Sequence, residues 1–184
     1  TRHVQVFLFD DYWEDIGTIR AFYEANLSLA NESSPFVLES PNAPIYSRAR
    51  FLPPTIAKGA LISGSMIADG CKIGKDVVIE DSVVGLRCVI EDGVTIRRSI
   101  LMGADEREIQ RVAQGASLPI GIGSGSVIEG AIVDKNCRIG KGVQIVNHQQ
   151  VQDSPDHPLC VIRDGIPVVV KDEELPDHWQ LQSS

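Results

Sequence analysis

The most constraining feature of this sequence is a series of aliphatic residues that recurs with a full period of 17. From Ile56 to Leu101 the steps between neighbours are 6, 5, 6, 6, 5, 6, 6 and 5, and from Ile122 to Ile145 they are 6, 5, 6 and 6. Any three consecutive steps add up to 17, so Ile56, Ile73 and Ile90 are equivalent positions. The complete series is Ile56, Ile62, Ile67, Ile73, Ile79, Val84, Ile90, Ile96 and Leu101, then Ile122, Ile128, Val133, Ile139 and Ile145.

This period belongs to neither a helix nor a single strand, which repeat every 3.6 and 2 residues. A chain wound into three-sided coils does produce it, because each side is a short strand with one aliphatic side chain pointing inward. Successive coils would stack about 4.8 Å apart, the spacing of paired strands. The sequence therefore predicts an all-β domain, a parallel β-helix with 17-residue coils.

The residues between the aliphatics agree with this architecture. Asp69-Gly70, Asp92-Gly93 and Lys141-Gly142 follow an inward aliphatic by two or three positions. Asp, Asn and Gly adopt the positive φ of a tight corner at the lowest cost. The pattern resembles the hexapeptide-repeat β-helix, which in known families is left-handed.

The four cysteines fit a structural role in this repeat. Cys71, Cys88 and Cys137 each lie four residues after an inward aliphatic and so share one column. Together with Cys160 they form no C-x-x-C pair and no metal-ligand spacing. We expect small, packed thiols in a reducing compartment rather than a redox or metal site.

One coil is interrupted between Leu101 and Ile122. The stretch Met102–Pro119 fits no strand of the repeat, and Asp105–Ala113 within it has helical propensity. We expect a short excursion from a corner of the β-helix, a place where insertions are tolerated and are often functional.

The first fifty residues have a different organisation. Val4–Phe9 predicts a buried strand, and Thr18 predicts the N-cap of a helix that runs to about Ala30. A single strand and helix cannot form a domain alone, so we interpret residues 1–30 as the end of a preceding domain and residues 31–54, rich in Pro, Ser and Asn, as a linker. The apolar stripe of the helix is Ile19, Phe22, Tyr23 and Leu27.

The charge distribution limits the partners. The net charge is −8, which argues against nucleic-acid binding. No apolar run approaches the roughly 20 residues of a membrane helix. Residues 131–171 nevertheless contain five basic and four acidic residues, whereas the rest of the chain contains 12 basic and 21 acidic ones. This region is relatively positive on an acidic protein.

Several motifs, taken in order, resemble one family. Tyr12–Thr18 is similar to the motif that ends the nucleotidyltransferase domain of sugar-nucleotide pyrophosphorylases. Further matches identify the chain as resembling the C-terminal portion of glucose-1-phosphate adenylyltransferases, preceded by a strand-helix remnant of their α/β nucleotidyltransferase domain. These matches are Pro44–Arg50, Leu52–Pro54, Leu101–Asp105, Pro119–Gly123 and Asp134–Asn136.

The resemblance implies a chemistry that this chain only partly carries. The family joins ATP and glucose 1-phosphate into ADP-glucose and pyrophosphate on Mg²⁺, for glycogen or starch synthesis. Asp15 matches a metal-binding carboxylate of the family. The nucleotide loop and the sugar-phosphate lysine belong to the N-terminal catalytic domain, so we expect the chain alone to be inactive. The resemblance also implies a cytoplasmic location in bacteria and a plastid location in plants or algae.

The resemblance further implies regulation by anions such as 3-phosphoglycerate and phosphate. Lys135 and Lys171 match two effector-binding lysines, and Arg48 and Arg50 match linker positions that line an anion pocket. Lys135 and Lys171 both lie in the relatively positive region, so the charge count agrees. The implied protein partners are the chain's own N-terminal catalytic domain and further subunits of a homo- or heterotetramer.

The end of the chain departs from the family pattern. Asp172–Trp179 is acidic and interrupted where the family continues with a strand. We therefore expect the β-helix to span residues 55–171 and residues 172–184 to form a tail.

Two other functions compete with this interpretation. A hexapeptide-repeat acyltransferase would use a histidine base in a cleft between β-helices. The repeats carry no histidine, and His148, His157 and His178 lie at or beyond their end. The other alternative is a purely structural module that presents a surface for oligomerisation.

Overall fold

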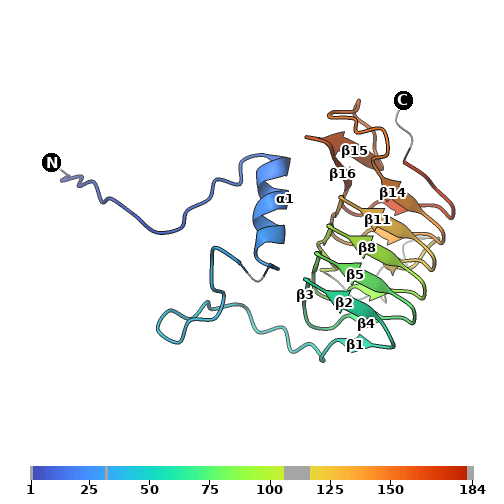
Figure 1. Ribbon diagram of the computed structural model, residues 1–184, viewed down its shortest axis with the longest axis horizontal. Coiled ribbons are helices and arrows are strands. Elements are labelled where there is room, and N and C mark those ends of the chain that lie inside the picture. Colours follow the sequence, from blue (N-terminus) through green and yellow to red (C-terminus); the bar gives the residue numbers. More distant parts are fainter. Residues whose placement is uncertain (1, 32, 106–116, 182–184) are drawn as a thin grey trace.

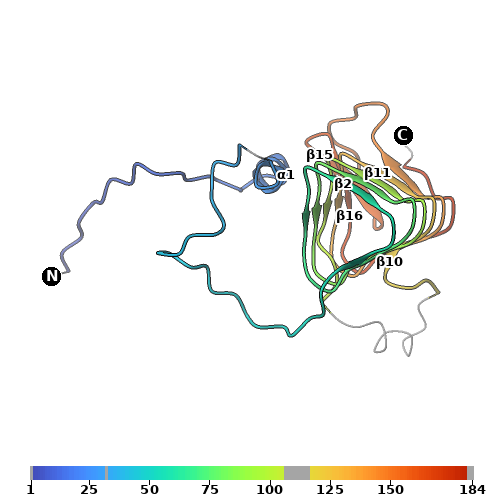
Figure 2. The same ribbon diagram turned by 60° about the horizontal axis from the view of Figure 1, so that its bottom comes forward.

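The computed structural model of the chain describes residues 2–31, 33–105 and 117–181. Residues 56–181 form a parallel β-helix whose three sheets make a three-sided cross-section, seen most clearly in Figure 2. This confirms the fold predicted from the 17-residue period. No helix in the described ranges has the length and apolar character to span a membrane.

Each face of the β-helix is one sheet, with strands from successive coils side by side. Sheet A contains β1 (Ile56–Ala57), β4 (Lys72–Ile73), β7 (Val89–Ile90), β10 (Gly121–Ile122), β13 (Arg138–Ile139) and β17 (Glu174–Leu175). Sheet B contains β2 (Leu61–Ser63), β5 (Val78–Glu80), β8 (Thr95–Arg97), β11 (Val127–Glu129) and β14 (Gln144–Val146). Sheet C contains β3 (Met66–Ile67), β6 (Val83–Val84), β9 (Ile100–Leu101), β12 (Ile132–Val133), β16 (Ile166–Val169) and β15 (Cys160–Arg163).

The inward aliphatics stack in register. Ile79 lies opposite Ile96, Val84 lies opposite Leu101, and Ile122 pairs with Ile90 across the interrupted coil. Because each inward side chain covers the next, the centre of the β-helix is fully buried from the second coil onward. Its largest buried side chains include Ile73, Ile79, Ile90, Ile96, Leu101, Ile128, Ile145 and Leu175.

The first coil does not keep the predicted register. Ile56 lies opposite Lys72, and Ala57 occupies the position opposite Ile73. The predicted equivalence of Ile56 with Ile73 is therefore wrong by one residue, and Ile56 is 56% exposed. No coil lies below this one in the described residues, so burial does not fix its register as it does in the interior.

The predicted corner glycines adopt the expected conformation. Gly70, Gly93 and Gly142 have φ of 79°, 71° and 63°. At the corner between sheets B and C, Asp81 and Arg98 adopt φ of 48° and 43°. The repeat therefore imposes left-handed corners even where a larger residue is present.

The β-helix continues past residue 171. The prediction that residues 172–184 form a tail outside it is therefore wrong for the last coil. β17 pairs with β13, and Leu175 lies opposite Ile139 and is completely buried. At the following corner the Lys141 N–H donates to Asp177 Oδ1 at 2.8 Å, and His178 has a φ of 62°. The acidic stretch is one more turn of the repeat, and Asp177 accepts a backbone N–H as Asp92 does at the same corner three coils earlier.

Two excursions leave the regular coils. Residues 147–165 separate β14 from β16 and include β15, which pairs antiparallel with β16 through a two-residue turn at Asp164-Gly165. Both turn residues have positive φ, 55° and 80°, as such hairpins require. The other excursion leaves the corner after β9. The predicted helical stretch Asp105–Ala113 lies outside the described residues except for Asp105 itself.

Helix α1 (Ile19–Ser28) lies against the outer face of sheet C (Figure 1). Thr18 caps it as predicted, accepting a hydrogen bond from the Ala21 N–H at 3.0 Å. The outer surface of sheet C is apolar because, in its strands, the residue directly before the inward aliphatic is apolar too and points outward. The predicted stripe Ile19, Phe22, Tyr23 and Leu27 packs on Val83, Ile100, Ile132, Ile166 and Val168.

The predicted buried strand Val4–Phe9 is absent from the structure. These residues have no regular secondary structure and are exposed, Val4 by 93%. An isolated strand leaves its backbone N–H and C=O groups unpaired, and no strand of the described residues runs beside this segment. The apolar side chains therefore have nothing to pack against here.

The cysteines are free and buried, as the column interpretation predicted. Burial raises the pKa of Cys137 to about 12 and that of Cys160 to about 12. A hydrogen bond with Cys71, together with burial, raises the pKa of Cys88 well above its usual value. The same hydrogen bond with Cys88 lowers the pKa of Cys71 to about 7, so the raised pKa values apply to Cys88, Cys137 and Cys160 only. No metal-binding group of three or more His, Cys, Asp or Glu occurs in the described residues.

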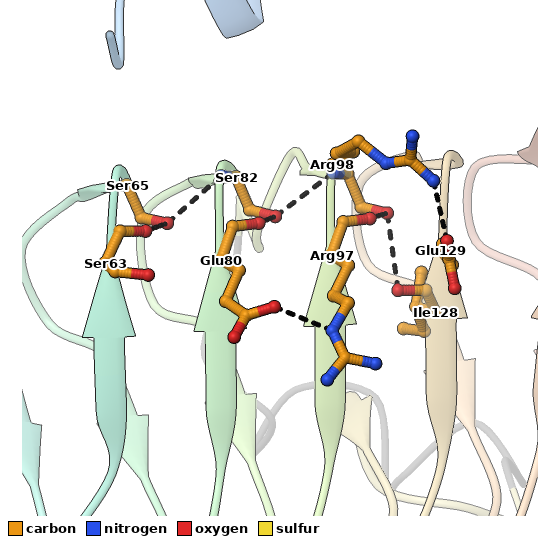
Figure 3. A network of polar contacts seen from close by, with 9 residues as sticks. Ser63, Ser65, Glu80, Ser82, Arg97, Arg98, Ile128 and Glu129 are labelled. Carbon is orange, nitrogen blue, oxygen red and sulfur yellow. Dashed lines mark hydrogen bonds and ion pairs between the residues drawn. The ribbon is translucent and has the colours of Figure 1, made fainter. Parts of the chain in front are cut away.

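A ladder of serines closes the corner between sheets B and C (Figure 3). Ser65 Oγ accepts from the Ser82 N–H at 3.0 Å, and Ser82 Oγ accepts from the Ser99 N–H at 3.1 Å. Each hydroxyl in turn donates to the carbonyl two residues before it. We call Ser65, Ser82 and Ser99 the serine corner. It satisfies the backbone N–H groups of a buried turn from within the fold.

Candidate effector site

Lys135 and Lys171 occupy equivalent positions on adjacent coils, at the corner between sheets C and A. Each follows an inward valine by two residues, and the Asp172 N–H donates to the Lys135 carbonyl at 3.0 Å. The two lysines are 36 residues apart in sequence, 19 more than one coil, because residues 147–165 leave the helix between them. The fold therefore places the two ammonium groups on adjacent coils, although the lysines are not one 17-residue period apart in the sequence.

Asp105 joins the two lysines. Lys135 Nζ lies 2.8 Å from Asp105 Oδ1, and Lys171 Nζ lies 3.8 Å from Asp105 Oδ2. The three side chains are 39%, 49% and 44% exposed for Lys135, Lys171 and Asp105. The hydrogen bond from Lys135 holds the pKa of the Asp105 carboxyl below its usual value. We call these three residues the lysine corner.

Two neighbouring residues hold the lysine corner in place. The Asp105 N–H donates to Asn136 Oδ1 at 2.9 Å, and Asn136 Nδ2 donates to Asp172 Oδ1 at 2.9 Å. Asn136 is buried and takes the left-handed conformation of this corner, with a φ of 62°. Asp134 Oδ1 accepts the backbone N–H of Lys135. Asp105 thus contacts both ammonium groups, and Asp134 and Asp172 also lie at this corner.

Arg87 adds a further cation one step along the same corner. Its Nη1 donates to the Ala104 carbonyl at 3.0 Å, directly before Asp105. Its charge also helps to lower the pKa of Asp105, after the contributions of Lys135 and Lys171. Of the relatively positive region predicted from the charge count, Lys135 and Lys171 lie at this edge of the β-helix, and Arg87 joins them from an earlier coil to make a cationic edge.

The linker attaches to this same edge. The Gly70 N–H donates to the Pro53 carbonyl at 2.9 Å, and the side chains of Leu52 and Arg87 both lie beside Gly70. Arg48 and Arg50, two to five residues earlier, are exposed, and Arg50 Nη1 donates only to the Arg48 carbonyl among the described contacts. The structure therefore brings Lys135 and Lys171 together but does not join either arginine to them.

Asp15 alone does not make a magnesium site. It is exposed, and its Oδ1 accepts the Gly17 N–H at 3.0 Å before helix α1. Mg²⁺ takes six oxygen ligands and usually needs carboxylates together with waters and substrate phosphates. Among the described residues Asp15 belongs to no group of three or more His, Cys, Asp or Glu that could hold a metal ion.

Two depressions lie elsewhere on the β-helix. One of about 530 Å³ lies beside sheet A and is lined in part by Lys58, Lys72 and Lys141. The other, of about 560 Å³, lies at the last coil and brings together His157 and His178. The lysine corner lines neither of them. It is an exposed edge, a shape suited to a small, highly charged anion rather than to a buried organic ligand.

The histidines at the last coil have structural contacts with the main chain. His157 Nδ1 accepts the Leu159 N–H at 3.2 Å, so the neutral ring carries its proton on Nε2 and offers no base there. His178 forms a left-handed corner and covers Gly142. His148 is exposed. These roles do not match a histidine base of an acyltransferase.

Asp105 is the site residue that the sequence reasoning did not single out. It lies 30 residues before Lys135 and outside the aliphatic series. One signal was available, because Asp105 closes the motif Leu101–Asp105 directly after an inward leucine. Only the stacking of coils shows that this motif lies beside Lys135 and Lys171.

One family model matches the chain. It is described as the GLGC left-handed parallel beta-helix domain, and it matches residues 50–179, which are 130 of the 184 residues. The match extends over every coil, including the last one and both lysines of the lysine corner. It also gives the hand of the β-helix, which the periodicity alone does not determine.

Proposed function

The chain belongs to the family of GLGC left-handed parallel β-helix domains, and on that premise we propose that its lysine corner binds anionic allosteric effectors. The family supports a place for the chain in the C-terminal portion of a glucose-1-phosphate adenylyltransferase, a nucleotidyltransferase. In this proposal the β-helix regulates and assembles an enzyme that makes ADP-glucose, while the reaction takes place in a separate catalytic domain.

The observation that carries the proposal is the stacking of Lys135 and Lys171 on adjacent coils around one carboxylate. Like charges are rarely held side by side without a counter-ion, because their repulsion costs free energy. A phosphate group has several oxygens and about −1.5 to −2 charges near neutral pH. It would contact both ammonium groups at once through charge-assisted hydrogen bonds.

The cationic edge also supplies a route by which binding reaches the rest of the chain. The bond from the Gly70 N–H to the Pro53 carbonyl attaches the linker to the same corner that carries the lysines. An anion bound there would act on the strand ends at the C–A corner and, through them, on the linker with Arg48 and Arg50. The described residues provide no complete catalytic or Mg²⁺ site, so the proposal assigns regulation and no chemical step to this chain.

Binding of inorganic phosphate to the chain tests this function directly. Calorimetry at low ionic strength should show binding to the native chain that weakens about tenfold in Lys135→Ala and in Lys171→Ala. Lys75→Ala is the matched control, since Lys75 is an exposed corner lysine whose side chain forms no hydrogen bond or ion pair with the described residues, while its backbone N–H donates to Asp92. Equal affinities of all four proteins would reject the effector site.

Two activity measurements separate regulation from catalysis. The isolated chain, given ATP, glucose 1-phosphate and Mg²⁺, should produce no ADP-glucose, and detectable turnover would contradict the domain assignment. In the full-length enzyme, Lys171→Ala should weaken activation by a phosphorylated sugar acid far more than it lowers basal turnover. An equal loss of both would argue for a purely structural role of Lys171.

Assembly into a tetramer is the second part of the proposal. The first coil exposes Ile56, Leu61 and Ile62 next to an unpaired strand edge, and such edges favour association with another chain. Sedimentation velocity of the chain and of Leu61→Lys tests this. A smaller assembly in the variant is the expected result, and identical sedimentation of both proteins would place the contact elsewhere.

A further inference from the structure

The position of Asp105 between the two lysines resembles that of a bound anion. One carboxylate oxygen lies 2.8 Å from Lys135 Nζ and the other lies 3.8 Å from Lys171 Nζ. A phosphate or carboxylate ligand that contacts both ammonium groups would need to place its oxygens in the same space. The site therefore already holds an anion, and that anion is part of the chain.

We propose that Asp105 is a tethered competitor for the effector, so that an anionic ligand binds Lys135 and Lys171 by displacing its carboxylate. This inference rests on the effector site proposed above and adds to it a built-in inhibitory contact. The effector would exchange one carboxylate for a more highly charged group. The apparent affinity for the effector is then lower than the two lysines alone would give, by the fraction of molecules in which Asp105 is displaced.

The contacts of Asp105 make displacement feasible. Its side chain is 44% exposed, and ion pairs at that exposure contribute little to stability because solvent screens them. Its backbone is fixed independently, because its N–H donates to Asn136 Oδ1 at 2.9 Å. The carboxylate can therefore rotate away from the lysines while the corner of the β-helix keeps its shape.

The charge state of Asp105 agrees with this role. Its pKa is lowered, first by the hydrogen bond from Lys135 and then by the charges of Lys135, Lys171 and Arg87. Asp105 is therefore ionised throughout the neutral pH range and competes fully there. Asp134 and Asp172 also lie at the corner, where Asp134 Oδ1 accepts the Lys135 N–H and Asp172 Oδ1 accepts from the Asn136 amide.

Asp105→Asn is the decisive variant, because it removes the charge while keeping the size and the backbone hydrogen bond. Inorganic phosphate should bind this variant about three- to tenfold more tightly than it binds the native chain at low ionic strength. Asp92→Asn is the control. It makes the same change in net charge at the corner between sheets A and B, where Asp92 accepts the Lys75 N–H, and should leave phosphate affinity unchanged.

The outcomes distinguish this inference from the proposed function. An unchanged or weaker phosphate affinity in Asp105→Asn would overturn the competitor role, while Lys135→Ala in the native background would still test the effector site. The tighter binding must also disappear in the double variant Asp105→Asn, Lys135→Ala. If it persists there, phosphate binds away from the lysine corner and both proposals are wrong. Circular dichroism of each variant verifies that the β-helix is retained.

Discussion

The serine corner and the lysine corner are built by the same repeat but treat polar groups in opposite ways. At the serine corner every hydroxyl accepts from the next coil and donates to its own, so the ladder is closed within the fold. The charges beside it alternate, with Arg97 on Glu80 at 2.7 Å and Arg98 on Glu129 at 2.6 Å (Figure 3). At the lysine corner two like charges share one carboxylate.

The difference shows how a repetitive fold separates stability from binding. A parallel coil places equivalent residues next to each other, so the sign of successive residues in a column decides whether charges cancel. Alternating Glu and Arg neutralise one another and leave nothing for a ligand. Two lysines in one column create a local positive potential that attracts an external anion. Four substitutions test this contrast, in order of decreasing expected effect.

Leu175→Ala should lower the free energy of unfolding by about 2–5 kcal/mol, because it opens a cavity in a fully buried position. Since Leu175 holds the coil that carries Lys171, phosphate affinity should fall as well. Ile79→Ala, beneath the serine corner, should cost similar stability and leave phosphate affinity unchanged in the folded protein. Urea denaturation and calorimetry measure the two quantities. Loss of phosphate binding in both variants would show that the corners are not independent.

Ser82→Ala should destabilise the chain by about 1–3 kcal/mol. Ser82 is completely buried, and its removal leaves the Ser99 N–H without an acceptor, whereas the Glu80 carbonyl keeps its bond from the Arg98 N–H. Phosphate affinity should not change, because the serine corner lies on another edge of the β-helix. A stability within error of the native chain would mean that water replaces the hydroxyl and that the ladder is dispensable.

Glu80→Gln should change the free energy of unfolding by less than about 0.5 kcal/mol. Glu80 and Arg97 are both nearly half exposed, and ion pairs of that kind contribute little. The corresponding loss of a negative charge at the lysine corner, Asp105→Asn, should instead raise the affinity for phosphate. A large loss of stability in Glu80→Gln would show that the alternating charges stabilise the fold and do more than neutralise each other.

Lys135→Ala should raise the pKa of Asp105 towards its usual value, because it removes the hydrogen bond that lowers it most. A carboxyl with a lowered pKa stabilises the fold at any pH above its unfolded-state pKa of about 3.9, and this contribution is lost as the pH falls through the folded value. The variant should lose this small, acid-sensitive contribution. Carboxyl chemical shifts followed by NMR between pH 2 and about 6 measure it, and an unmoved titration would remove Lys135 as its cause.

The sequence predicts the structure well in the interior coils, where the pattern of buried residues repeats. It predicts the structure poorly where that pattern ends or is interrupted. The 17-residue period predicted the coils from Ile73 to Ile145, because each inward side chain must cover the next. It misplaced Ile56, which has no coil below it, and it missed Leu175, because residues 147–165 interrupt the count. In hindsight Val169, Leu175 and Leu181 resume the steps of 6, and Asp177 repeats the corner chemistry of Asp92.

The site was predictable only in part, for a related reason. Lys135 and Lys171 were identified from the family resemblance, and the structure brings them together. Asp105 was not singled out, because its nearness to them depends on how the coils stack and not on local sequence. The outer face of sheet C carried a readable signal that was overlooked. Aliphatic pairs such as Ile100-Leu101 and Ile132-Val133 place one side chain outward and so call for a covering element.

That covering element has a consequence for how the chain unfolds. Stacked repeats contact only their neighbours and tend to fray from the ends, one unit at a time. Helix α1 rests on Val83, Ile100, Ile132 and Val168, which belong to four successive coils. It therefore links these four coils. Their amide hydrogens should exchange with solvent at similar rates, rather than one coil after another from either end.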